Sequence, residues 1–210
     1  MLYSITKETV NASKKPTFIT AGIKENIYLK NVIYDTVTDK NIEFLSFNFE
    51  NENGDKFTHT EFPVYMSKPL EVMSAEEKER FYGDLEAKMS RIKQIVEVFK
   101  DNFIIETDTF KNLAEAVIKF LGNSYENKAV RVKIVYNNKG WTTFPNKKWQ
   151  AKHTFIESMD VAAELTRIQK VPGDVFERPI RPDVEKIDNN PIEVGNVPTN
   201  SIEDKDEIPF

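Results

Sequence analysis

The sequence contains no cysteine, only two histidines and only seven glycines among its 210 residues. The lack of cysteine excludes a disulfide, a thiol nucleophile and a cysteine-type zinc site, and it fits a reducing compartment. The glycine-rich phosphate-binding motifs and the nucleophile-elbow motif of hydrolases are missing too. His59 and His153 are too few to suggest a metal site, and no nucleophile lies beside a matched base. We therefore expect a binding protein and not an enzyme, with no metal and no cofactor.

Long apolar runs are missing as well. No hydrophobic stretch approaches the length of a membrane span, and the first residues lack the charged and apolar regions of a signal peptide. We therefore expect a cytoplasmic location and no membrane partner. With 40% hydrophobic residues, a chain of this length can bury the core of one ordinary domain.

Acidic side chains are entirely missing from residues 128–152. This stretch holds seven lysine and arginine residues and four aromatic ones, including both tryptophans of the protein. Cations neutralise phosphates, and exposed rings offer stacking surfaces to unpaired bases. The stretch therefore predicts a nucleic-acid site, although the same pattern also fits a solvated strand whose tryptophans belong to the core.

The predicted site combines phosphate contacts with stacking rings. Alternation in residues 130–136 puts Arg131 and Lys133 on one strand face and the aliphatic side chains on the other. Turn residues follow at 137–140, so we expect the later aromatics in or near a loop. We expect phosphate contacts from Arg131, Lys133, Lys139, Lys147, Lys148 and Lys152, and base stacking on Tyr136, Trp141, Phe144 and Trp149, with Tyr28 in the same groove.

The net charge of −5 is unevenly distributed along the chain. Residues 171–210 carry ten acidic and four basic side chains and six of the ten prolines, whereas the rest of the chain is nearly neutral. No helix or strand period survives in this segment, so it cannot bury enough surface to offset its ordering entropy. We expect an N-terminal arm at 1–16, a nucleic-acid-binding domain at 17–170, and a disordered acidic tail at 171–210.

Hydrophobic alternation predicts strands on both sides of a helical insert at 74–121. In the insert, Ser74 and Glu77 form a capping box at the start of one helix, and a second helix ends before Gly122. Five short strands with a helix between the third and fourth suit a mainly β, α+β fold, namely a Greek-key barrel of the OB type. A split α+β sheet would accommodate the same order. The expected strands lie at 18–37 (one long strand or two joined ones), 42–50, 56–65, 130–136 and 151–157, with a hairpin turn at Asn53-Gly54 and a short last helix at 160–170.

The end of the chain, at 204–210, reads Asp-Lys-Asp-Glu-Ile-Pro-Phe. Acidic residues that run into Ile-Pro-Phe resemble the tail tip of bacterial single-stranded DNA-binding proteins. In that family the body is an OB fold, and a flexible acidic tail carries a tip that recruits replication and repair enzymes. The resemblance implies single-stranded DNA binding in DNA replication, recombination and repair. The implied partner-binding residues are Asp204, Asp206, Glu207, Ile208, Pro209 and Phe210.

Two features depart from the bacterial pattern. Lys205 interrupts the acidic run, and the helical insert is longer than in the bacterial family. The longer insert favours a phage-encoded or divergent variant over a housekeeping one, so the expected location is the cytoplasm of a bacterium or of a host during phage infection. Two other functions remain open: a phage strand-annealing or recombination protein, and a structural or adaptor protein whose basic strand binds a protein partner. The sequence is also compatible with a homo-oligomer and leaves the preference between DNA and RNA open.

Overall fold

The computed structural model describes residues 17–37, 41–66 and 68–179. Its strands pair in antiparallel ladders, and two α-helices accompany them. The expected mainly β, α+β class is therefore confirmed. In chain order the elements of this part are β1 (Gly22–Val37), β2 (Ile42–Asn51), β3 (Lys56–Glu61), a 3-10 turn (Leu70–Val72), α1 (Ala75–Glu97), α2 (Phe110–Leu121), β4 (Ala129–Tyr136), β5 (Thr142–Thr143), a 3-10 turn (Gln150–Lys152), β6 (Ile156–Ser158) and a 3-10 turn (Ala163–Leu165).

The first three strands form a meander. Asn51 organises the turn between β2 and β3, because its side-chain oxygen accepts the backbone N–H groups of Asn53 and Asp55 at 3.0 and 2.9 Å. Gly54 adopts a φ of +84°, a conformation that glycine reaches without steric cost. The hairpin therefore lies where Asn53-Gly54 predicts it.

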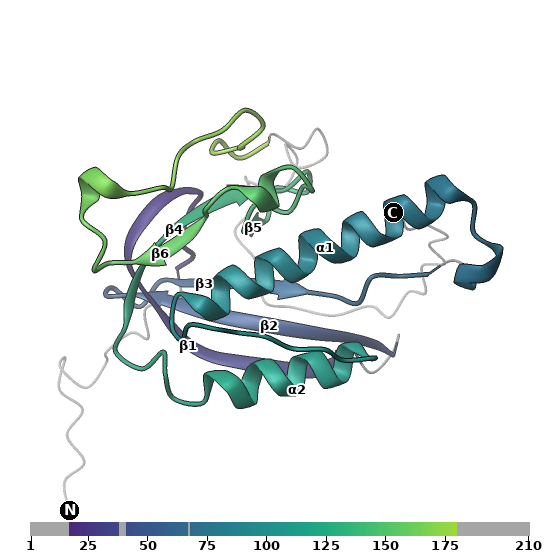
Figure 1. Cartoon of the computed structure of the whole chain (residues 1–210). Coiled ribbons are helices and arrows are strands. Elements are labelled where there is room, and N and C mark those ends of the chain that lie inside the picture. Colours follow the sequence, from purple (N-terminus) through teal and green to yellow (C-terminus); the bar gives the residue numbers. More distant parts are fainter. Residues whose placement is uncertain (1–16, 38–40, 67, 180–210) are drawn as a thin grey trace, which may run out of the picture. The chain divides into compact units, whose positions relative to one another are not determined.

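β1 is shared between two neighbouring strands. Its residues 27–37 pair with β2, and residues 22–28 pair with β4. Register shifts interrupt the ladders between Lys24 and Ile27 and between Leu29 and Asn31. Because bulges bend a strand and increase its twist, β1 can leave one half of the sheet and enter the other, as its purple ribbon shows (Figure 1). The resulting strand order is β3-β2-β1-β4-β5, with β6 also paired to β4.

Both helices contribute apolar side chains to the same core as the strands. α1 begins with the predicted capping box, in which Ser74 Oγ accepts the Glu77 N–H and the Glu77 carboxylate accepts the Ser74 N–H. Its buried stripe includes Ile92 and Val96, which recur at helical spacing. α2 begins at the N-cap Thr109, and its buried side chains meet β1 and β2 (Figure 1). The predicted helical insert is thus confirmed as two helices.

The two ends of the strand order, β3 and β5, contact each other through side chains. Nδ1 of His59 on β3 lies 3.2 Å from Oγ1 of Thr143 on β5, and it accepts the N–H of Phe144 at 3.4 Å. In the part of the chain that the structure describes, no backbone ladder joins these two strands. The sheet is therefore antiparallel and open in its hydrogen bonding along this seam.

Two elements after β4 differ from their predictions. The expected return strand at 151–157 is reduced to the three-residue strand β6, because Gln150–Lys152 form a 3-10 turn at its start, and the two-residue strand β5 lies before the expected range. The expected helix at 160–170 is only the turn Ala163–Leu165. The backbone beyond this turn does not continue as a helix, since the N–H of Arg167 bonds to the carboxylate of Glu157 on β6.

The acidic tail begins later than predicted. Residues 171–179 pack on the sheet: Asp174 is buried, and the Tyr136 N–H donates to the Val175 carbonyl at 2.8 Å. The chain divides between Pro179 and Ile180, so the expectation of disorder is wrong for 171–179. The arm at 1–16, the rest of the tail and its tip at 204–210 lie outside the described residues.

Candidate nucleic-acid interface

Arg131 is buried in a cluster of ion pairs. Its Nε donates to Glu25 at 2.8 Å, and its Nη1 donates to Glu157 at 2.6 Å. Glu157 also accepts the Thr166 hydroxyl and the Arg167 N–H. Burial alone would raise the pKa of Glu157, but the hydrogen bonds from Thr166 and Arg131 outweigh it and lower that pKa. The prediction that Arg131 contacts phosphate is wrong, because two carboxylates already neutralise a side chain that lies below the surface.

Lys133 is fully buried as well. Its Nζ lies 2.9 Å from Oδ2 of Asp174 and donates to the Gln169 carbonyl at 2.9 Å. The Asp174 carboxylate also accepts the Val171 N–H at 2.8 Å and the Gln150 side-chain amide at 2.9 Å. Buried charges persist when they are paired and hydrogen-bonded in this way. The prediction that Lys133 contacts phosphate is therefore also wrong.

The two cations of β4 hold residues 166–179, which we call the C-terminal strap. The predicted alternation is correct, since Arg131 and Lys133 do share one face of β4. Through Glu157 of β6 and Asp174 of the strap, that face is occupied by the chain itself. The strand's basic pattern therefore reflects an internal electrostatic attachment.

Phe144 is a core residue and not a stacking surface. It has no exposed area, and its ring centroid lies 5.5, 4.9 and 4.8 Å from those of Phe49, Phe57 and Phe155. Such tilted and edge-on contacts stabilise an aromatic core. The prediction that Phe144 stacks on a base is wrong, because the short strand β5 turns this ring inward.

Trp141 and Tyr136, in contrast, line an open groove of about 410 Å³. Trp141 is 59% exposed, and Phe18, which precedes β1, is 74% exposed. Two hydroxyl side chains of β3, Thr58 and Thr60, line the same groove. We call this the aromatic groove, and its principal lining residues are Phe18, Thr58, Thr60, Tyr136, Trp141 and Arg178.

A second cavity, of about 320 Å³, adjoins the aromatic groove at Tyr136, which lines both. The side chains of Lys139 and Lys147 are exposed beside it. Among the described residues, no carboxylate pairs with Lys147. We call this cavity the lysine pocket, and it is lined by Tyr136, Asn138, Lys139, Asn146, Lys147 and Gly173.

Trp149 lies against the strap and is 42% exposed. A Cβ atom on Gly173 would lie 2.8 Å from Cζ2 of this ring, so the strap can approach the tryptophan only with glycine at this position. The neighbouring Lys148 forms an ion pair with Asp84 of α1 at 3.1 Å. Trp149, Lys148 and the exposed Lys152 line a third cavity, of about 310 Å³, on the side of α1.

Tyr28 lies apart from these cavities. It lines neither the aromatic groove nor the lysine pocket, and its hydroxyl lies 3.4 Å from Oε1 of Glu52. The structure therefore brings together Tyr136, Lys139, Trp141 and Lys147 from the predicted set. It adds Phe18 and Arg178, which the composition of the basic stretch could not indicate because they belong to distant parts of the sequence.

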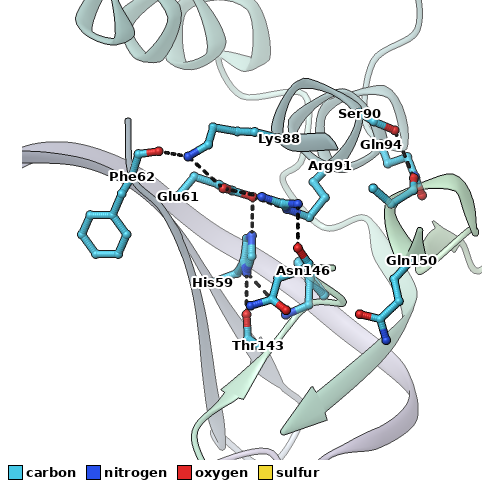
Figure 2. A network of polar contacts seen from close by, with 12 residues as sticks. His59, Glu61, Phe62, Lys88, Ser90, Arg91, Gln94, Thr143, Asn146 and Gln150 are labelled. Carbon is cyan, nitrogen blue, oxygen red and sulfur yellow. Dashed lines mark hydrogen bonds and ion pairs between the residues drawn. The ribbon is translucent and has the colours of Figure 1, made fainter. Parts of the chain in front are cut away.

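A buried polar network supports the seam beside the aromatic groove (Figure 2). His59 and Glu61 point from β3 toward α1, where Arg91 binds both oxygens of Glu61 at 2.6 and 3.0 Å. Nε2 of His59 lies 3.0 Å from the same carboxylate. Lys88 lies 3.8 Å from Glu61 and donates to the backbone carbonyl of Phe62.

This network fixes the ionisation of Glu61. Burial by itself would raise the pKa of this carboxyl, but the hydrogen bonds from His59 and Arg91 together outweigh burial and lower it to about 2. Arg91 also donates to the Asn146 carbonyl at 3.3 Å, next to the lysine pocket. Arg91 thus connects Glu61 of β3 and its own helix α1 with the segment after β5.

A further cavity, of about 740 Å³, lies elsewhere, between α1, α2 and the segment after β3. Its walls are mainly apolar, and Glu106 and Asp108 lie along it. Lys88 is its one cation among the lining residues. These features suit an apolar ligand surface better than a phosphate chain.

Two general properties hold for the residues described. Neither helix combines the length and the apolar character needed to cross a bilayer. No cluster of three or more histidine and carboxylate side chains is arranged to hold a metal ion in this part of the chain.

In comparisons with known proteins, no protein-family model, no curated protein and no solved structure matches this chain.

Proposed function

We propose that this protein binds single-stranded DNA without sequence preference, and that the aromatic groove and the lysine pocket form its binding site. The observation that carries this proposal is the junction at Tyr136, where exposed rings and exposed lysines adjoin. Rings such as Trp141 and Phe18 would stack on unpaired bases, while Lys139 and Lys147 would neutralise phosphates. A duplex hides its base faces, which favours a single strand as the ligand.

The topology supports an OB-type barrel as the architecture behind this site. The ladders connect β3-β2-β1-β4-β5, and the His59–Thr143 contact brings β5 back to β3. The helices lie between the third and fourth strands, where that fold has its helix. OB folds bind oligonucleotides over strands 2 and 3 and the loop between strands 4 and 5. Thr58 of β3 and Trp141 in the β4–β5 loop would occupy these positions.

Binding to fluorescent oligo(dT) tests the proposal. We expect anisotropy to rise with protein concentration, and affinity to fall as salt increases, with a slope of log K against log[salt] near −0.7 for each phosphate neutralised. Duplex DNA of the same length should bind more weakly, and an RNA oligonucleotide gives the preference between nucleic acids. No binding to oligo(dT) at low salt would refute the proposal, and rapid pairing of complementary strands would indicate an annealing protein.

We further propose that the tail recruits replication or repair proteins through residues 204–210. The proposal rests on the resemblance of the sequence Asp-Glu-Ile-Pro-Phe to the tips of bacterial single-stranded DNA-binding proteins. An apolar ring that follows acidic side chains suits a small pocket with a basic rim. Deleting Phe210 should leave oligo(dT) affinity nearly unchanged and abolish retrieval of replication enzymes from lysate. Identical sets of retrieved proteins with and without Phe210 would exclude recruitment by the tip.

A second candidate function, that of a protein adaptor, is favoured by the apolar cavity between α1 and α2. Its walls include Met66, Phe81, Leu85 and Met89, which are side chains typical of adaptable protein-binding grooves. Replacing Leu85 by Asp should then abolish partner binding and leave oligo(dT) binding unchanged. If oligo(dT) does not bind, this candidate becomes the leading one.

A further inference from the structure

The C-terminal strap forms part of the wall of both cavities that make up the proposed binding site. Gly173 and Val175 line the lysine pocket, and Arg178 lines the aromatic groove. The strap is therefore positioned to contact whatever ligand occupies these cavities. This matters because composition alone assigns residues 171–179 to the acidic tail.

Three contacts fix the strap in this position. The buried ion pair between Lys133 and Asp174 holds it to the face of β4. The hydrogen bond from the Tyr136 N–H to the Val175 carbonyl attaches the strap to the last residue of the same strand. Gly173 packs on the ring of Trp149 at a distance that leaves no room for a Cβ atom. A segment attached at these points presents its next side chains at a defined place.

Arg178 is the cation that this attachment presents. A Cβ atom built on Gly140 would lie 3.5 Å from Nε and 3.6 Å from Cγ of Arg178, so the arginine lies across the turn that precedes Trp141. The side chain is exposed, and no carboxylate among residues 17–37, 41–66 and 68–179 forms an ion pair with it. Arg91 and Arg131, in contrast, are each held by buried carboxylates. Within the described part of the chain, therefore, no carboxylate competes with a ligand for Arg178.

We propose that Arg178 binds a phosphate of the nucleotide whose base stacks on Trp141, and that the strap is an integral part of the nucleic-acid site. This inference rests on the proposed single-stranded DNA binding and assigns the phosphate contact within the aromatic groove, which otherwise offers rings and hydroxyls. A guanidinium suits this role because its planar donors match phosphate oxygens and it stays charged at every physiological pH.

The full-length protein carrying Arg178→Ala tests the inference, with fluorescent oligo(dT) as the probe. We expect affinity to fall about tenfold at low salt, as for the loss of a hydrogen bond to a charged group. The slope of log K against log[salt] should become shallower by about 0.7, corresponding to one phosphate. Arg178→Lys should restore most of the slope, because it keeps the charge. If the Arg178→Ala variant unfolds at the same temperature as the wild type, its loss of affinity does not come from misfolding.

Arg167→Ala is the matched control, because Arg167 is another exposed arginine of the strap but lines neither cavity. Equal affinity and equal salt slope for the Arg178 and Arg167 variants would overturn the inference and leave the proposed function intact. Failure of the unaltered protein to bind oligo(dT) would overturn the proposed function, and the inference with it.

Discussion

Nζ of Lys133 lies 2.9 Å from Oδ2 of Asp174, and neither side chain has any exposed surface. The pair joins the middle of β4 to a residue that sequence composition assigns to the tail. Each charge has its counter-charge only while the other is in place, because burial removes the water that would otherwise solvate it. The attachment of the strap and the stability of the sheet are therefore coupled.

Replacing Asp174 by Ala should destabilise the fold by about 3–5 kcal/mol, since it leaves the Lys133 ammonium buried without a counter-charge. The double variant Lys133→Met with Asp174→Leu should recover much of this loss. Urea denaturation measures both. Glu177→Ala, at an exposed position of the strap, serves as the control. Unfolding of the Asp174 and Glu177 variants at the same urea concentration would contradict the role given to the pair.

Replacing Trp141 by alanine and replacing Phe144 by alanine should have different effects on DNA binding and on stability. Trp141→Ala is expected to weaken oligo(dT) binding by about 1–3 kcal/mol with little change in stability, because the ring is exposed in the groove. Phe144→Ala should lower the free energy of unfolding by about 3–5 kcal/mol, because it empties a core position. Titration and denaturation of each variant separate the two effects. Unchanged binding in the Trp141 variant would remove this ring from the site.

The adjacent residues Lys147 and Lys148 should contribute differently to the salt dependence of DNA binding. Lys147→Ala is expected to make the salt dependence of binding shallower by about 0.7, since Lys147 lines the lysine pocket. Lys148→Ala should change the slope less, because Asp84 already neutralises Lys148. Binding isotherms at several salt concentrations give both slopes. A larger effect at Lys148 would place the phosphate path on the side of α1.

Glu61 should make the free energy of unfolding depend on pH in the acidic range. Its pKa is about 2 in the folded protein and near 4.5 for an unperturbed carboxyl, so the unfolded chain binds the proton first as pH falls. The contribution of Glu61 is fully present above about pH 4.5 and is lost as pH falls toward 2, and linkage puts it on the order of 3 kcal/mol. Glu61→Gln should therefore be much less stable than the wild type at pH 7.

The stability difference between Glu61→Gln and the wild type should shrink as pH approaches 2, because protonation then removes the same charge from the native carboxylate. Chemical denaturation across this range measures it. Glu79→Gln, at an exposed position of α1, should show no such convergence. A difference that stays constant between neutral and acid pH would contradict the low pKa of Glu61.

The position of a tail truncation should decide the sign of its effect on DNA binding. Residues 180–210 carry eight acidic and three basic side chains. A tethered anionic segment competes with DNA for a cationic site, most strongly at low salt. A chain ending at Pro179 should therefore bind oligo(dT) more tightly than the full chain. A chain ending at Lys170 also loses Asp174 and Arg178, so it should bind more weakly.

Alternating and periodic residues predicted most of the architecture. The meander, the hairpin at Asn53-Gly54 and the capped helix after Ser74 all depend on neighbours close in sequence, and such signals can be read without the fold. The alternation of Arg131 and Lys133 on β4 was equally readable. The partners that cover this face could not be predicted, because Glu25 and Asp174 lie far away along the chain.

The candidate site was predicted only in its central part. Trp141 and Lys147 belong to the basic stretch, so composition indicated them. Phe144 has the same composition signal, but the inward turn after β5 buries it. Arg178 could not be predicted, because its segment resembles a charged tail until the buried partner of Asp174 is known. Tertiary ion pairs, which local patterns do not encode, account for these differences.

The division of β1 between a near and a distant partner strand has a consequence for the order in which the chain folds. The part of β1 that pairs with β2 meets a strand that begins five residues after β1 ends, whereas Ile27 pairs with Val130 about 100 residues later, and such distant pairings slow folding. The meander can therefore form while the ribosome is still adding the helices. β4 must then find an edge that is already present. Until it arrives, the first half of β1 remains an unprotected template for other chains, so this interval is when the nascent protein is most exposed to aggregation.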